Sequence, residues 1–275
     1  MSEYTLAKWK TPEELIRIGY RQSRVVMMNE AHNGRARCRR TREVGVTILP
    51  VAHEIGVRHI AMEVLSPEIT TELNKTRRLP YDAGGYLEQQ DMRLLVQNIL
   101  DLGWTLVSYE DDGLLWLRSK YPDSVPTELS TEKTVHLYRK YQHEFLTDEY
   151  TNYREIQQAK NITSFLATVP ETTKLFVWCG NGHHSKLPSD TWAPMGYQFQ
   201  KISSISPFCI DQSVTVKFDE EYSPYTQRVI DELSEDLRAH HRTAGFLVQE
   251  APSVVQGWKS VDAIILSLDN EMTEE

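Results

Sequence analysis

The sequence has few cysteines, no long apolar run and a deficit of positive charge. Its three cysteines, Cys38, Cys179 and Cys209, are odd in number and far apart, so they form neither a disulfide framework nor a CxxC zinc pattern. No stretch approaches the roughly 18–20 apolar residues of a membrane span, and the first residues lack the apolar segment of a signal peptide. We therefore expect a cytoplasmic protein that does not bind membranes.

The charge balance argues against nucleic-acid partners. The 275 residues include 30 Lys and Arg against 39 Asp and Glu, a formal charge of −9, so the chain should repel nucleic acid outside any local basic patch. With 40% hydrophobic and 25% charged residues, the composition is that of a folded globular protein with a substantial core. We expect a small-molecule substrate.

Short apolar runs alternate with stretches of helical periodicity along most of the chain. Residues 25–28, 59–62, 104–107 and 174–178 are typical of buried strands. Further strands are predicted at 198–205, 214–218, 246–249 and 261–267, and helices at 12–21, 36–55 (kinked or divided by Pro50), 81–102, 131–167 (interrupted near Thr147), near Trp192 and at 224–240.

This alternation predicts an α/β fold: a mixed, mainly parallel central sheet with helices on both faces. We expect one domain over residues 1–275. A helical insertion is expected around 114–168, and a short disordered tail at 269–275.

Acidic or imidazole side chains follow each of the first four predicted strands. In an open parallel sheet the carboxyl ends of the strands lie at one edge, where ligands bind. A polar residue after one strand is more often solvated than catalytic, but four such endings, two with histidine, favour a functional site. The residues concerned are Glu30 and His32, Glu63, Tyr109 and Glu110, and Asn181 and His183.

The local patterns indicate roles for some of these residues. Glu30 and His32 are two residues apart and face the same side in extended backbone, so they can share a metal or form an oriented general base. Glycines after the fourth strand allow a sharp turn that brings His183 over the site. Arg154 begins a polar helical stripe with Gln158 and Asn161, which is a solvated face unless it faces the cleft and holds a carboxylate.

One basic cluster stands at the expected start of a helix, where the helix dipole disfavours cations. It comprises Arg35, Arg37, Arg39, Arg40 and Arg42. These guanidinium groups could form an anion site or pair with acids such as Asp111. We expect Arg37, Tyr109, Glu110 and Asn181 to contact the substrate, which the cluster suggests is anionic.

The order of these motifs resembles the superfamily of erythromycin esterases, ChaN-like haem-binding proteins and Tiki/TraB-type proteins. Asn29 stands where that family usually has glycine, and Gly180 where the esterases carry an additional histidine. Four motifs of the family have counterparts here in the same order. Residues 28–33 are similar to its G-E-x-H-like motif and residues 61–63 to its A-x-E motif. Residues 154–162 are similar to R-(D/E)-x-x-x-A-x-N-I, and residues 180–183 to G-N-x-H.

The resemblance implies a site built from Glu30, His32, Glu63, Arg154 and His183. We expect a hydrolase acting on an ester, amide or phosphoester. His32 would activate water directly, or the two histidines and two glutamates would hold a Zn or Mn ion that does so. The alternative is a ChaN-like protein that binds haem or another small ligand, with Tyr109 or a histidine as axial ligand.

Overall fold

The structure is a computed structural model. It describes residues 9–32, 35–63, 65–81, 84–111, 113–127, 129–213, 215–216, 243–250 and 260–268.

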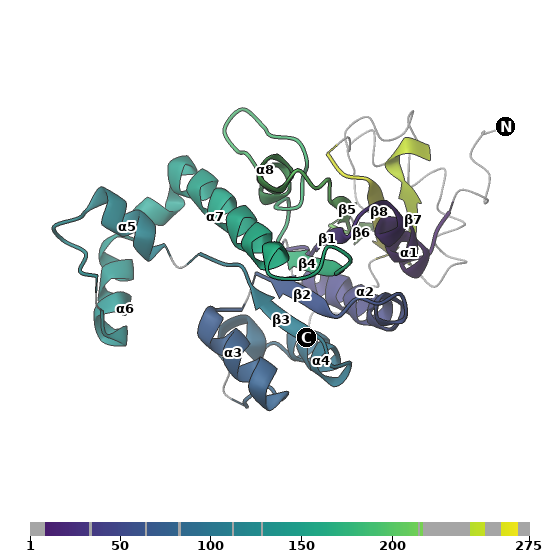
Figure 1. The fold of residues 1–275 in the computed structure, drawn as a ribbon, viewed down its shortest axis with the longest axis horizontal. Coiled ribbons are helices and arrows are strands. Elements are labelled where there is room, and N and C mark those ends of the chain that lie inside the picture. Colours follow the sequence, from purple (N-terminus) through teal and green to yellow (C-terminus); the bar gives the residue numbers. More distant parts are fainter. Residues whose placement is uncertain are drawn as a thin grey trace.

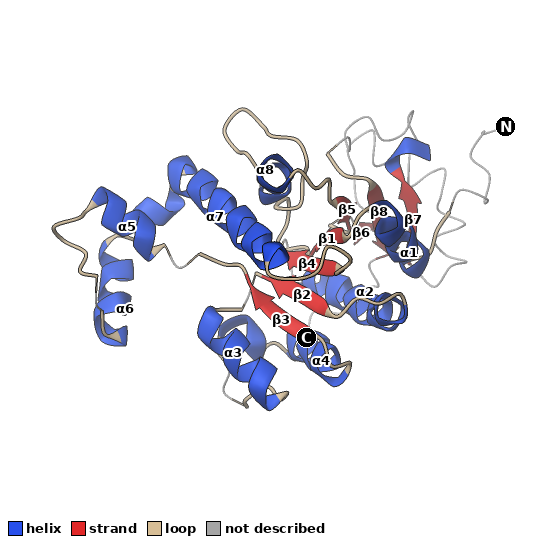
Figure 2. Ribbon diagram, viewed as in Figure 1, coloured by secondary structure: helices blue, strands red, loops and turns tan. Residues whose placement is uncertain are grey.

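The described residues form one eight-stranded sheet, which confirms the predicted α/β class (Figure 2). Seven strands pair in parallel, and β7 (Thr243–Leu247) pairs antiparallel with β8. From one edge the parallel strands are β3 (Thr105–Ser108), β2 (His59–Met62), β4 (Leu175–Cys179), β1 (Val25–Asn29), β5 (Phe208–Asp211), β8 (Ala263–Leu268) and β6 (Thr215–Val216). The register sets Met62 beside Ser108 and Trp178, and Asn29 beside Cys179, so β1 to β4 end at one level.

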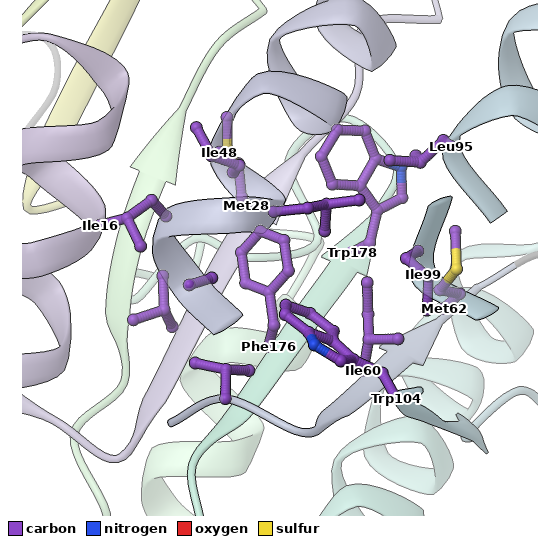
Figure 3. Close-up of a cluster of buried hydrophobic side chains, with 14 of the residues drawn as sticks. Ile16, Met28, Ile48, Ile60, Met62, Leu95, Ile99, Trp104, Phe176 and Trp178 are labelled. Carbon is purple, nitrogen blue, oxygen red and sulfur yellow. The ribbon is translucent and has the colours of Figure 1, made fainter. Parts of the chain in front are cut away.

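Helices cover both faces of the sheet (Figure 1). One face packs against α1 (Pro12–Gln22), α2 (Arg35–Glu54) and α4 (Gln90–Asp101), and the other against α7 (Asp148–Ala167) and α8 (Met195–Ser203). Neighbouring strand residues alternate between the two cores, because successive side chains of a strand point to opposite faces. Met28 and Trp178 therefore belong to the first core (Figure 3), whereas Met27 and Val177 belong to the second.

The first helix begins as its sequence predicts. The Thr11 hydroxyl accepts a hydrogen bond from the Glu14 backbone N–H at 3.2 Å, and the Glu14 carboxylate accepts one from the Thr11 N–H at 2.7 Å. This reciprocal capping box satisfies backbone donors that the first turn leaves unpaired. α2 also follows the prediction in length, but it runs through Pro50 to Glu54 as one helix.

One predicted element is wrong, and another is right only in its second half. Residues 198–205 lie mostly in α8, not in a strand: Met195 and Phe199, four residues apart, share its buried face. The predicted helix 81–102 is a short 3-10 turn, η2 (Gly85–Glu88), followed by α4, because Gly84 and Gly85 have φ values of 75° and 56° that a helix does not allow. The predicted helix 224–240 and the tail 269–275 lie outside the described residues.

The segment between β3 and α7 projects from the sheet (Figure 1). It contains α5 (Leu114–Lys120), α6 (Thr131–Lys140) and η3 (Glu144–Leu146). Trp116, Leu117, Leu137 and Tyr141 form a small apolar cluster there, separate from the two cores of the sheet. The remaining described helix, α3 (Pro67–Thr76), lies beside β3 (Figure 1). None of the described helices is long and apolar enough to cross a membrane.

Candidate functional site

A cavity of about 290 Å³ lies where β1, β2, β3 and β4 end. We call it the inner cavity. Glu30, Glu63, Glu110 and Gly180 are each the first or second residue after one of these strands, and all line it. The rest of the lining is His32, Tyr86, Arg154, Trp178 and Cys179. The structure thus brings together residues up to 150 positions apart in the chain.

Glu30 forms hydrogen bonds with three other residues of the site. Arg42 donates to it from Nε and Nη2, at 2.8 and 3.0 Å, and the Trp178 indole N–H donates at 3.0 Å. Nε2 of His32 lies 3.0 Å from its Oε1. The Glu30 side chain is only 3% exposed and that of Arg42 is fully buried, so solvent scarcely screens this pair.

These contacts shift the pKa of both Glu30 and His32. Burial alone would raise the pKa of Glu30, but the hydrogen bonds from His32 and Arg42 hold that pKa below its usual range. The Glu30 carboxylate in turn raises the pKa of His32. Glu30 is therefore an anion that orients the imidazole, and His32, whose side chain is 38% exposed, is the more accessible of the two.

Arg154 joins the ends of β2 and β3. It donates to Glu63 at 2.7 Å and to Glu110 at 2.8 and 2.5 Å, while Gln158, one turn further along α7, also donates to Glu110. The other oxygen of Glu63 accepts from the Gly180 N–H at 2.5 Å. The polar stripe predicted on this helix therefore faces the site.

Gly180 is needed for the close approach of the site residues. A Cβ at this position would lie 2.7 Å from Cε1 of His32 and 2.8 Å from a carboxylate oxygen of Glu63. The absence of a side chain on Gly180 therefore allows the imidazole and the Glu63 carboxylate to meet over the end of β4.

His183 forms a second imidazole–carboxylate pair. Its Nδ1 lies 2.5 Å from the fully buried Glu155, and its Nε2 lies 3.8 Å from Glu63. The other carboxylate oxygen of Glu155 accepts a hydrogen bond from the backbone N–H of Met195 at the start of α8. Burial of His183 would lower its pKa, but the carboxylates of Glu155 and Glu63 raise the pKa overall.

The four residues expected to contact substrate lie in different surroundings. Glu110 lines the inner cavity. Tyr109 does not, because it is fully buried and its hydroxyl donates to the Trp178 carbonyl at 3.2 Å. Asn181 is exposed and accepts from Asn29 at 3.5 Å, outside the cavity lining. Arg37 lies on α2 and lines neither the inner cavity nor the larger cavity beside it.

The sequence reasoning did not assign three residues that the structure places at the site. The sequence places Arg42 in the basic cluster. It also stands three residues before Gly45 and seven before Leu49, on the buried stripe of α2, and this helical spacing predicts an inward-facing side chain. Glu155, beside Arg154, likewise has the helical spacing of the buried face of α7. Tyr86 lies in a segment that was predicted to be a helix, so no signal identified it.

The carboxylate oxygens that a divalent cation would need already accept hydrogen bonds. Both oxygens of Glu30 accept from Arg42, and those of Glu63 accept from Arg154 and Gly180. Within the described ranges, no group of three or more His, Cys, Asp or Glu side chains is arranged to hold a metal ion. Tyr109, the residue expected as an axial haem ligand, is fully buried, and its hydroxyl donates to the Trp178 carbonyl.

Comparison with known proteins supports the fold. No family model and no curated protein matches the sequence. Among solved structures, a mutant of the erythromycin esterase EreC in its open conformation is 13% identical, with a TM-score of 0.55 over 95% of this chain and 97% of that one. A Bacillus cereus protein is 10% identical, with a TM-score of 0.55 over 94% of this chain and 92% of that one. The haem-binding ChaN of Campylobacter jejuni is 10% identical, with a TM-score of 0.51 over 92% of this chain and 90% of that one.

These identities establish a shared α/β fold and nothing finer. The chain also spans 36–37% of the length of several bacterial toxin structures, at TM-scores of 0.45 and 0.46. One fold therefore includes an esterase and a haem-binding protein, so the function of this chain has to be argued from its own site.

Proposed function

We propose that this chain is a hydrolase in which His32 activates water to cleave an ester, amide or phosphoester bond. The observation that supports this most is the hydrogen-bonded pair of His32 and the buried Glu30 at the inner cavity. A carboxylate that holds the proton on Nε2 leaves Nδ1 of the same ring as the base. The fold shared with an erythromycin esterase is consistent with this chemistry.

The proposed step uses both imidazoles. His32 takes a proton from water, and the water oxygen adds to the carbonyl carbon or phosphorus of the substrate. Arg154 stabilises the negative charge that develops on the substrate oxygen. His183 is not among the lining residues of the inner cavity, but its Nε2 lies 3.8 Å from Glu63, which is. Held protonated by Glu155, His183 gives its proton to the leaving group as the bond breaks, and solvent then restores both protonation states.

We infer that this reaction needs neither a resident metal nor haem. The guanidinium groups of Arg42 and Arg154 supply the positive charge that a cation would otherwise supply next to Glu30 and Glu63. Activity should therefore survive exhaustive dialysis against EDTA. Loss of activity on EDTA treatment, with recovery on adding Zn or Mn, would establish the metal-dependent alternative instead.

The test is hydrolysis of a panel of p-nitrophenyl esters, p-nitroanilides and p-nitrophenyl phosphates. For any substrate that is cleaved, His32→Gln should lower kcat/KM by about 100-fold or more, the contribution typical of a general base. His136→Gln is the matched control, because His136 is exposed on α6 and does not line the cavity. Hydrolysis that His32→Gln leaves intact would refute the proposal.

A further inference from the structure

A second, larger cavity of about 640 Å³ adjoins the inner cavity, and we call it the outer cavity. The two cavities share two lining residues, His32 and Tyr86. A substrate whose reacting bond lies beside His32 therefore has direct access to the outer cavity for the part of the molecule beyond that bond. A volume of this size holds a substituent about as large as a small organic ligand.

Tyr86 forms the wall between the two cavities. Its ring lies nearly parallel to the His32 imidazole, with 27° between the planes and 6.0 Å between centroids, and the Arg42 guanidinium lies 5.8 Å from its centre. The Tyr86 side chain is nevertheless 45% exposed. The positive φ values of Gly84 and Gly85 set the backbone just before it, although a Cβ at either glycine would meet no atom within 4 Å. Glycine is therefore needed at these two positions for the backbone conformation before Tyr86, and not to make room for a neighbouring atom.

The described residues that line the outer cavity are the rings of Tyr86 and His32, together with Cys38, Gly85 and four polar side chains. Its charged side chains, Arg35 and Glu88, have opposite signs, and Gln89 and Gln90 add amides. The Gln89 side-chain oxygen accepts from Arg42, the residue that holds Glu30, so this wall is connected to the site. None of the described residues that line it has an aliphatic side chain. An alkyl chain would gain little there, whereas a group with donors and acceptors at its edge would replace its lost hydration.

We infer that the outer cavity is a subsite for a polar ring: a cyclic group that packs one face on Tyr86 and directs hydrogen-bonding atoms toward the side chains of the wall. A sugar ring and a nitrogen heterocycle share this chemistry. The inference rests on the proposed function only in placing the cleaved bond of the same molecule in the inner cavity. It predicts that fatty acyl esters are poor substrates and that Tyr86 determines specificity.

Cys38 provides a measurement that does not depend on turnover. It is half-buried and lines the outer cavity, whereas Cys179 and Cys209 are buried. Burial raises the pKa of Cys38 to about 11, so alkylation by iodoacetamide at about pH 9 is slow enough to follow by mass spectrometry. Methyl β-glucopyranoside, adenosine and 1-hexanol are tested as probes. A ring probe at about twice its Kd should slow Cys38 alkylation about threefold, and hexanol should not.

Variants then test the wall residue. Tyr86→Ala should abolish the protection, Tyr86→Phe should keep it, and Tyr81→Ala is the control, because Tyr81 is 97% exposed and outside both cavities. Circular dichroism and thermal unfolding show that each variant is folded. Protection by the glucoside alone identifies a sugar subsite, and by adenosine alone a heterocycle subsite.

Three results would overturn the inference: no protection by either ring, equal protection by hexanol, or protection that Tyr86→Ala leaves unchanged. The hydrolase activity is tested independently of the subsite. A protein whose Cys38 is protected by a ring probe but which cleaves no member of the ester, anilide and phosphate panel has the subsite without the activity.

Discussion

Replacing Arg42 by methionine should destabilise the protein far more than replacing any exposed arginine of the same helix. Methionine keeps much of the side-chain volume and removes the charge. The change leaves Glu30, only 3% exposed, without its two guanidinium hydrogen bonds, and Asp91 without its contact at 2.8 Å. The Gln89 oxygen also loses its donor at 2.5 Å.

The expected cost follows from this burial. Breaking a buried ion pair by removing one partner typically costs about 3–5 kcal/mol, because the remaining charge stays buried and unpaired. Arg39→Met is the matched control: Arg39 also pairs with a glutamate, Glu43, at 3.0 Å, but both side chains are about half exposed. Exposed pairs of this kind contribute about 0–1 kcal/mol.

Urea denaturation followed by circular dichroism measures both variants, and pH adds a second test. Arg42 helps to hold the pKa of Glu30 below its usual range, so this stabilisation is full above the pKa of an unfolded carboxylate and is lost as the pH falls. The difference between wild type and Arg42→Met should be largest near neutral pH and shrink in acid. A cost for Arg42→Met no larger than that for Arg39→Met, or one independent of pH, would refute the reasoning.

Two further predictions concern the geometry and protonation of the site. Gly180→Ala should lower kcat/KM at least about tenfold while costing no more than about 1–3 kcal/mol in urea, because its Cβ would lie within 2.8 Å of His32 and Glu63 and must displace them. Glu155→Gln should shift the alkaline limb of the pH–rate profile to lower pH, because the carboxylate that raises the pKa of His183 is lost and the acid deprotonates sooner. An unmoved limb would argue that His183 is not the proton donor.

The fold was predictable where strands are buried on both faces. The strands at β1, β2 and β4 appear in the sequence as continuous apolar runs, because helices cover both sides of them. α8 was missed because its nine residues alternate polar and apolar side chains over a stretch too short to separate a helical period from a strand period. Tertiary contact with α7 decides its conformation.

The candidate site was predictable as a meeting of strand ends, but its internal pairing was not. Glu30, Glu63 and His183 were identified because a parallel sheet gathers such positions at one edge. Which cation neutralises which acid depends on helix rotation, and Arg42 shows this. Its neighbours Arg39 and Arg40 pair with Glu43 on the surface, while Arg42 itself turns inward. Whether these residues act on a substrate stays a prediction.

The charge balance of the assembled site narrows the substrate beyond what the sequence suggested. Two guanidinium groups stand among more carboxylates than they can neutralise, and the nearby carboxylates raise the pKa of His32 and that of His183. The carboxylates are those of Glu30, Glu63, Glu110 and Glu155. An anionic substrate would favour protonated imidazoles still further and so suppress His32 as a base. We therefore expect the proposed hydrolase to cleave a neutral ester or amide faster than a phosphate ester, although the arginine cluster of the sequence suggested an anion.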